Sequence, residues 1–469
     1  MLISKEMKVN NLNKHLTIKI LFIFCLFTID CKKQNDWLDI KNDKRAVVPT
    51  TLSDFQAMLD NTGIFNEKYS TAGLVGADNY YLTDNSYKTY DETTRNLYIW
   101  NNTIWEGGIS TEWNNYFTVI QLANVILDGL KKNNTLSADY NNIKGQALFH
   151  RAISYYNLSQ LFCKPYSKTA ETDLGLPIRL NSDVNETFKR ASLDATYQQI
   201  INDALEASKL LPTSQSYLQR PINAAAFALL AKTYLNMSNY NLAKNFADKT
   251  LNIRPDLLDY NTIVSTSLTY RFSEFGKANS EILFYAQALI YPVVSPLTSA
   301  QGLVSNDLYQ SYEDADLRKQ LFYFGNDLNI KFRGAYSGNR RNFAGLATNE
   351  IYLIRAECNA REGNIANALS DLNMLLINRY KTNNFTKVNS DNQEEVLKFI
   401  LKERRKELPF VSNIRWEDLR RLNQETRFQK VLSRTINGIT YSLSPNDKRY
   451  TLPIPLQEIQ LSGIQQNDR

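Results

Sequence analysis

Apolar residues recur at spacings of three and four over several long segments of the chain. This period is typical of helices that bury one face. The pattern is clearest over residues 111–131, and it returns over 139–162, 193–211 and 224–237. Pro165 and Pro212 follow two of these segments, where a helix is expected to end. The sequence therefore predicts an all-α fold in the main.

Two segments have the pattern of a helix pair joined by a tight turn. One is residues 231–243, and the other is residues 356–368, where Gly363-Asn364 forms the turn. Small residues such as Ala360 and Ala368 stand where the two helices would approach closely. The pattern resembles the tetratricopeptide hairpin, but the copies do not follow each other at the repeat of about 34 residues of that family. We expect helix hairpins that meet near Asn239 and Gly363, without a regular array.

Residues 255–345 interrupt the helical pattern. They are rich in Ser, Asn, Tyr and Gly, and alternating apolar residues predict a strand over 281–291 and a strand or irregular segment over 321–333. We therefore expect a helical scaffold over about 36–254 and 346–469, with an inserted loop-rich lobe of minor β structure over about 255–345. Residues 80–108 form a second loop-rich region, and loops on a rigid scaffold commonly bind ligands.

The N-terminus has the pattern of an export signal. Lys14 and Lys19 precede a short apolar run, residues 20–29, which stops before Cys31. The run is too short to span a bilayer, which takes about 20 residues. A cysteine at this place predicts a lipoprotein signal over residues 1–30 and an acylated Cys31, although Asp30 is unusual there. Plain secretion is the alternative, and the start is either Met1 or Met7.

Composition and charge exclude some classes of protein. Hydrophobic residues make up 43% and charged residues 22%, which is ordinary for a folded chain. The net charge of +6 is spread along the sequence, so nucleic-acid binding is not indicated. Cys163 and Cys358 remain after the signal, and we expect both to be buried and unpaired, although export permits a disulfide.

Few residues point to catalysis or to a metal. The mature chain has one histidine, His150, inside a predicted helix, where a structural role is expected. There is no glycine-rich phosphate loop, no dinucleotide fingerprint and no Cys-x-x-Cys pair. Acidic residues are numerous, so a carboxylate pair remains an open alternative. Asp78, Asp84 and Asn85 are possible calcium ligands that fit no loop signature.

Aromatic residues are the better candidates for a binding site. They make up 12% of the chain, and many stand among Asn, Asp and Thr, above all over residues 80–105. Flat rings contact the apolar faces of sugars, while amides and carboxylates bond their hydroxyl groups. Peptide side chains fit the same rings, and packing is the alternative role for each tyrosine. The predicted ligand contacts are Tyr80, Tyr81, Tyr291, Tyr309 and Tyr323.

Several motifs in order resemble the SusD/RagB family of outer-membrane nutrient-binding lipoproteins. The resemblance covers nearly the whole mature chain, 31–469. Its motifs are CKKQNDWLDIK at 31–41, VPTTLSDFQAMLD at 48–60, QALFHRAISYYNLSQLF at 146–162, EIYLIRAE at 350–357 with REGN at 361–364, ERRKEL at 403–408, RWEDLR at 415–420 and PIPLQEI at 453–459.

The resemblance implies a lipid-anchored protein at the cell surface, on the outer membrane, with tetratricopeptide-like hairpins. It implies binding of an oligosaccharide or a peptide, delivery to a SusC-like TonB-dependent transporter, and neither catalysis nor a cofactor. The family's ligand residues vary, so none is transferred to this chain. A secreted helical glycan-degrading enzyme is the alternative. The charged motif over 403–420 alternates with an apolar stripe, and we expect it to lock the helical core through partly buried ion pairs.

Overall fold

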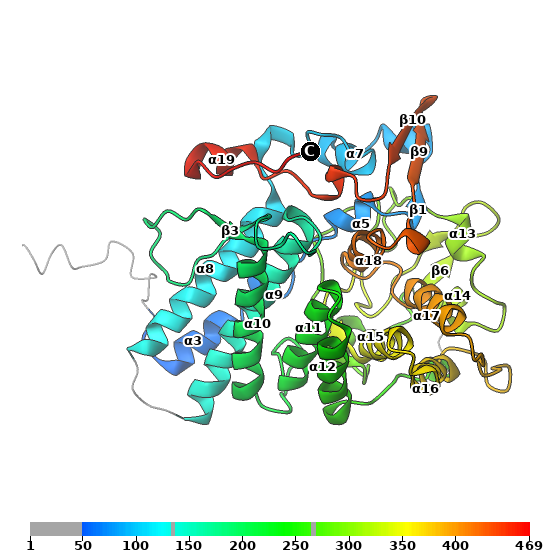
Figure 1. Cartoon of the computed structure of the whole chain (residues 1–469), viewed down its shortest axis with the longest axis horizontal. Helices are drawn as coiled ribbons and strands as arrows, with labels where there is room; N and C mark the ends of the chain where they lie inside the picture. Colours follow the sequence, from blue (N-terminus) through cyan, green and yellow to red (C-terminus); the bar gives the residue numbers. More distant parts are fainter. Residues whose placement is uncertain (1–48, 133–136, 264–268) are drawn as a thin grey trace, which may run out of the picture. The chain divides into compact units, whose positions relative to one another are not determined.

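The structure is a computed structural model, and it describes residues 49–132, 137–263 and 269–469. Within these residues long helices dominate, and strands are no longer than five residues (Figure 1). The predicted mainly helical fold is therefore confirmed. The predicted signal and Cys31 lie outside the described residues. No helix in the described ranges combines the length and hydropathy that crossing a membrane requires.

The long helices begin and end close to where the periodicity places them. Ser110, Ser137 and Ser192 each cap a helix, because the hydroxyl oxygen accepts a hydrogen bond from the backbone N–H three residues on. The long helices are α8 (Thr111–Lys131), α9 (Ala138–Phe162), α10 (Leu193–Leu210), α11 (Asn223–Asn236), α12 (Tyr240–Ile253), α15 (Thr348–Arg361), α16 (Ile365–Ile377), α17 (Gln393–Glu407) and α18 (Ile414–Leu422).

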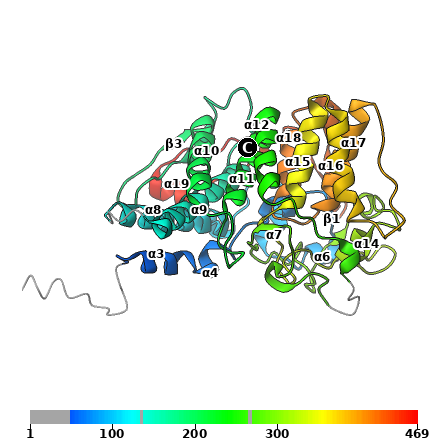
Figure 2. The same cartoon turned by 90° about the horizontal axis from the view of Figure 1, so that it is seen from below.

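Both predicted helix hairpins are present. Between α11 and α12, Ser238 has a φ of 57°, and the side chain of Asn239 accepts a hydrogen bond from the N–H of Leu242. Between α15 and α16, Gly363 has a φ of 80°, a left-handed conformation that favours glycine. The hairpins pack side by side, since α12 contacts α15 (Figure 2). Ala360 and Ala368 are fully buried at the second hairpin.

The remaining elements are short. The short α-helices are α3 (Leu52–Leu59), α4 (Thr62–Phe65), α5 (Ala72–Gly76), α6 (Asp84–Tyr87), α7 (Glu92–Tyr98), α13 (Asn306–Tyr309), α14 (Leu317–Phe322) and α19 (Leu456–Ser462). The 3₁₀ turns are η1 (Glu106–Gly108), η2 (Tyr260–Thr262), η3 (Glu274–Gly276), η4 (Thr426–Phe428) and η5 (Lys448–Tyr450).

The strands form two-stranded antiparallel pairs. They are β1 (Tyr80–Tyr81) with β5 (Leu303–Val304), β2 (Leu174–Pro177) with β3 (Arg190–Ser192), β4 (Ile282–Phe284) with β8 (Leu346–Ala347), β6 (Tyr323–Phe324) with β7 (Lys331–Phe332), and β9 (Leu432–Ile436) with β10 (Ile439–Leu443). The strand predicted over 281–291 is wrong in length, because regular pairing stops at Phe284 and only isolated bridges at Gln287 and Ala288 follow. The predicted segment 321–333 holds the end of α14 and the β6–β7 pair.

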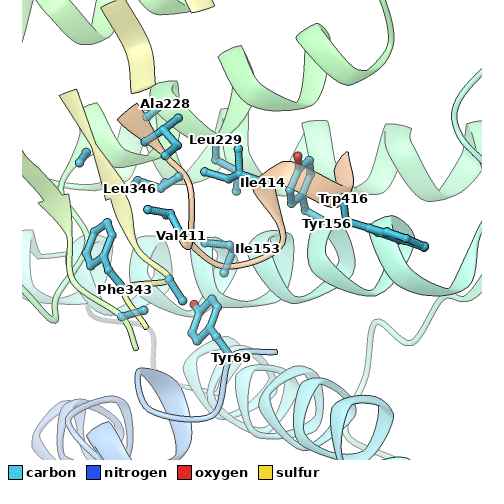
Figure 3. Packing of buried hydrophobic residues seen from close by; sticks show 14 of the residues in the cluster. Tyr69, Ile153, Tyr156, Ala228, Leu229, Phe343, Leu346, Val411, Ile414 and Trp416 are labelled. Atoms are coloured by element: carbon cyan, nitrogen blue, oxygen red, sulfur yellow. The ribbon is translucent and has the colours of Figure 1, made fainter. Parts of the chain in front are cut away.

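The core joins parts of the chain that are far apart in sequence. Figure 3 shows side chains of α9 and α11 beside Phe343, Val411, Ile414 and Trp416. All residues over 145–162 of α9 are buried, so this helix is enclosed by its neighbours. The indole of Trp416 packs against Gly73, where an added Cβ would lie 2.8 Å from the ring. Any larger residue at position 73 of α5 would therefore clash with this indole unless the packing shifted.

The expectations for the cysteines and the histidine are met. Cys163 and Cys358 are buried and free of disulfides. His150 lies among the rings of Phe65, Phe149 and Phe284, and burial lowers its pKa from 6.5 to about 3. The imidazole is therefore neutral, and it acts in packing.

Charged side chains of α17 enter the interior and take part in two groups of buried ion pairs, one that contains Glu403, Lys406 and Glu407 and one that contains Arg404. We call them the α17 network. Its contacts, with their distances, are Arg318–Asp316 at 2.7 Å, Arg318–Glu403 at 2.7 Å, Arg318–Glu407 at 3.0 Å, Arg379–Glu281 at 2.6 Å, Arg379–Glu407 at 2.9 Å, Lys406–Asp316 at 2.9 Å, Arg404–Glu350 at 2.9 Å, Arg404–Asp418 at 2.9 Å, Arg421–Asp418 at 2.8 Å, Arg421–Glu357 at 2.6 Å and Lys232–Glu350 at 3.4 Å.

The network ties distant elements to one another. Through Arg404 it links α17 to α15 and α18, and through Glu407 it links α17 to residues of the predicted lobe. The ion pairs predicted over 403–420 are thus confirmed, and they are more deeply buried than expected. A buried charge costs several kcal/mol to desolvate, so each member depends on its partners.

Removing one member of the network should destabilise the protein strongly. We expect Arg404→Met to lower the free energy of unfolding by about 3–5 kcal/mol, because Glu350 and Asp418 keep buried charges with one partner fewer. Lys398→Met on the exposed side of α17 is the matched control, and loss of its pair with Glu394 should cost about 0–1 kcal/mol. Urea unfolding measures both, and similar losses for the two variants would contradict the interpretation.

The α17 network should also make the free energy of unfolding depend on pH. Burial by itself raises the pKa of Glu357, but the charges of Arg421 and Arg361 outweigh it and lower the pKa from 4.5 to about 2. A depressed pKa stabilises the fold above pH 4.5, and this contribution is lost as the pH falls toward 2. Between these values, stability should fall less steeply with pH in Glu357→Gln than in the wild type or in the exposed-site control Glu394→Gln. Equal slopes of urea stability against pH in all three would refute the assignment.

Candidate functional site

A groove of about 420 Å³ lies between β1, the segment that leads into α13, and β9. Pairing of Tyr80 with Val304 and Tyr81 with Leu303 brings the first two elements together. The β9–β10 hairpin turns at Asn437 and Gly438, which have φ angles of 50° and 78°. Positive φ at both central residues is the geometry of a tight two-residue hairpin turn, and Asn-Gly is its preferred sequence. We call this hollow the β9 groove.

Arg434 forms the inner wall of the β9 groove. Its guanidinium lies 3.8 Å from the ring centre of Tyr98, 4.6 Å from that of Trp100 and 5.5 Å from that of Tyr80. The same group donates hydrogen bonds to the backbone carbonyls of Val75, Tyr98 and Ala77. These contacts fix the rings and the strand together, so the wall is rigid before any ligand arrives.

Paired charges line one end of the β9 groove. The carboxylate of Asp78 accepts from Arg415 at 2.6 and 2.8 Å and from Lys430 at 2.7 Å. Burial raises the pKa of Asp78, but the charges of Arg415, Arg405 and Lys430 outweigh it and hold that pKa well below 3.8. Asp307 accepts from Arg405 at 2.8 Å and lies 3.5 Å from Lys430. Because Asp307 and Lys430 are 55% and 41% exposed, they offer hydrogen bonds to a ligand.

The accessible groups of the β9 groove suit a ligand with many hydroxyl groups. Tyr81 is half-buried, and its hydroxyl donates to the carbonyl of Leu328 at 3.2 Å. Ser433 and Thr435 alternate with buried residues along β9, so they are the exposed members of that strand. A half-buried ring, hydroxyls and charged hydrogen-bonding groups therefore converge on one hollow, as in sites that orient a polar ligand.

The five predicted tyrosines lie in different settings. Tyr80 and Tyr81 line the β9 groove, but Tyr80 is only 3% exposed and donates to the carbonyl of Val75 at 2.7 Å. Tyr309 and Tyr323 contact each other edge to face, and Tyr323 is also 3% exposed. Tyr291 is half-buried and donates to the carboxylate of Glu112. Ligand contact by these residues stays a prediction, and Tyr81 is the one that the groove leaves accessible.

Other parts of the groove were not predicted. Arg434 and the whole of β9 enter it from a segment in which the sequence showed no candidate site, whereas Asp307 lies in the predicted lobe, two residues from the predicted contact Tyr309. The Asn437-Gly438 pair was the available signal for the hairpin. The possible calcium ligands have other roles, since Asp78 is surrounded by cations and Asp84 accepts from the N–H of Asn437 at 2.8 Å. Over the described ranges, no three His, Cys, Asp or Glu side chains are grouped to hold a metal ion.

A larger hollow of about 600 Å³ runs along α8, residues 177–188 and α19. Its wall includes Phe117 and Phe188, and Trp113 donates to the carboxylate of Glu458 at 3.3 Å beside it. None of the five predicted tyrosines lies there. We therefore take the β9 groove as the candidate site.

Comparison with known families gives two matches. A profile described as "Starch-binding associating with outer membrane" matches residues 36–235, and a profile described as "SusD family" matches residues 334–468. The two matches do not overlap, and together they cover most of the chain. A curated relative, SusD-like protein P2 of Formosa agariphila, is 29% identical over 147 residues. That match spans 31% of this chain and only 28% of the relative.

Solved structures share the fold over nearly the whole chain. A SusD superfamily protein from Bacteroides thetaiotaomicron has a TM-score of 0.71 at 23% identity, and the match covers 89% of this chain and 100% of that one. A putative sugar binding protein from Bacteroides vulgatus has a TM-score of 0.73 at 22% identity, over 90% of this chain and 99% of that one. A SusD-like carbohydrate binding protein from the same species has a TM-score of 0.67 at 21% identity, over 88% and 97%.

Proposed function

Because the chain belongs to the SusD/RagB family, we propose that it binds an oligomeric nutrient, a glycan, at the cell surface and delivers it to a TonB-dependent outer-membrane transporter. The proposal includes a lipid anchor at Cys31 and a binding role without chemical turnover. One matching family is described as starch-binding, and two structural relatives are described as sugar or carbohydrate binding proteins, which supports the choice of a glycan.

The β9 groove is the observation on which the proposed site rests. A sugar presents hydroxyls at its rim and C–H groups on its faces, so it needs hydrogen-bonding groups beside an aromatic ring. The hydrogen-bonding groups come from Lys430, Asp307, Ser433 and Thr435. The aromatic ring comes from Tyr81. Arg434 contacts the rings of Tyr98, Trp100 and Tyr80 in the wall of the groove, and Arg405 holds Asp307. Contacts that exist before binding lower the entropy lost when a ligand binds.

A glycan array followed by calorimetry on the purified protein tests the ligand and the site. We expect Tyr81→Ala to weaken binding of the array's best oligosaccharide about fivefold to tenfold, because a stacking ring contributes on the order of 1 kcal/mol. Tyr81→Phe keeps the ring and should stay within about twofold of the wild type. Unchanged affinity in Tyr81→Ala would contradict the site, and hydrolysis of the oligosaccharide by the wild type would contradict the binding role.

A separate experiment tests the proposed anchoring to the outer membrane. Several acyl chains on Cys31 would hold the protein firmly on a membrane, since stable anchoring takes more than one chain. We expect wild-type protein to sediment with outer membranes and to co-purify with a transporter, and Cys31→Ala to be released into the soluble fraction. Cys163→Ala is the control, because that cysteine is buried and cannot carry the anchor. Equal membrane partitioning of all three forms would rule out the anchor.

A further inference from the structure

A separate hollow of about 340 Å³ lies between residues 59–66, at the end of α3, and residues 217–220, in the loop before α11. We call it the α3 pocket. Figure 1 places α3 on the opposite side of the described unit from the β9–β10 hairpin, so the α3 pocket is distinct from the β9 groove. Its volume falls within the range of small-ligand sites, about 300–1,000 Å³.

Tyr217 is an unusual residue in this protein. Its side chain is 61% exposed, and among the exposed large hydrophobic residues of the described ranges it is the only aromatic one. The other tyrosines in the described part of the chain are buried or partly buried. A ligand in the pocket would cover the open part of this ring.

One face of the Tyr217 ring is already occupied. The guanidinium of Arg220 lies 5.3 Å from the ring centre, and it donates two hydrogen bonds to Asp60, at 2.8 and 2.7 Å. The charges of Arg220 and Asp60 cancel each other. These two residues therefore give the pocket no net charge that would attract an anion or a cation. Asp60 retains acceptor capacity and Arg220 retains donor capacity, which suits neighbouring hydroxyl groups of a neutral sugar.

The loop that carries Tyr217 is held in place from both sides. The N–H of Tyr285 donates to the carbonyl of Leu218 at 2.7 Å, and the amide of Asn66 donates to the carbonyl of Gln219 at 3.0 Å. The Arg220–Asp60 contact ties the loop to α3 as well, so the position of the Tyr217 ring beside the pocket is fixed by the fold.

We propose that the α3 pocket is a second carbohydrate contact site, which takes a neutral sugar residue on the open face of Tyr217. The inference rests on the proposed function, because it assumes that the protein handles glycans. Tyr217 provides the stacking surface, while Gln219, Asp60 and Arg220 bond the hydroxyls. Two contact sites on one protein raise retention of a long chain by increasing the effective concentration at the second site.

The test uses three neutral hexasaccharides, maltohexaose, laminarihexaose and mannohexaose, and calorimetry on protein purified from membranes. The variants are Tyr217→Ala, the matched control Tyr217→Phe, and Tyr81→Ala in the β9 groove. For at least one sugar we expect Tyr217→Ala either to lose one binding site per chain or to weaken binding by about fivefold or more, with Tyr217→Phe within about twofold of the wild type. Thermal unfolding should be unchanged, because the ring is exposed.

Three other results of this calorimetry would decide against one or both of the proposed sites. If Tyr217→Ala binds with wild-type affinity and stoichiometry while Tyr81→Ala loses binding, the α3 pocket is overturned and the proposed function stands. If Tyr217→Ala loses binding and Tyr81→Ala does not, the α3 pocket is supported and the β9 groove is overturned. If none of the three sugars binds the wild type, the inference and the proposed binding of neutral glycans are overturned together.

Discussion

The buried charges of α17 are the constraint on which the other parts of this structure depend. Arg404 faces inward to Glu350 and Asp418, while the next residue, Arg405, faces Asp78 and Asp307 at the β9 groove. The same division recurs on α18, where Asp418 belongs to the α17 network and Arg415 holds Asp78. One side of each helix thus holds the scaffold and another side shapes the groove. The position of the groove is therefore set by how those two helices pack.

The helical scaffold was predictable because its signals are local. The apolar period over 111–131 gives α8 with the same bounds, and the turn at Gly363 needs only a glycine between two helical patterns. The charged motif over 403–420 also predicted ion pairs, since its charges alternate with an apolar stripe along a helix. The partners of the α17 charges at Asp316, Arg318 and Glu350 could not be predicted, because a sequence does not state which distant carboxylate meets which cation.

The candidate site was predictable only in part, because a sequence does not show which distant residues meet. Composition drew attention to the tyrosines near residue 80, and Tyr81 does line the groove. Yet the ring of Tyr80 is covered by Arg434, which comes from a strand near the other end of the chain. The pattern could not separate a ring that packs from a ring that faces solvent. Tyr217 was not among the predicted contacts, because residues 212–222 form a short polar connection between two predicted helices.

The hydrogen bond from Arg434 to Val75 spans 359 residues, and the bond from Trp105 to the carbonyl of Pro453 spans 348. Pairing across such distances has a high entropic cost and slows folding. Until β9 arrives, the rings of Tyr80, Tyr98 and Trp100 lack the cation that covers them. A nascent or truncated chain without its last forty or so residues would present these rings as an adhesive surface. The packing around these rings is therefore complete only when the C-terminal part of the chain, which carries β9, is in place.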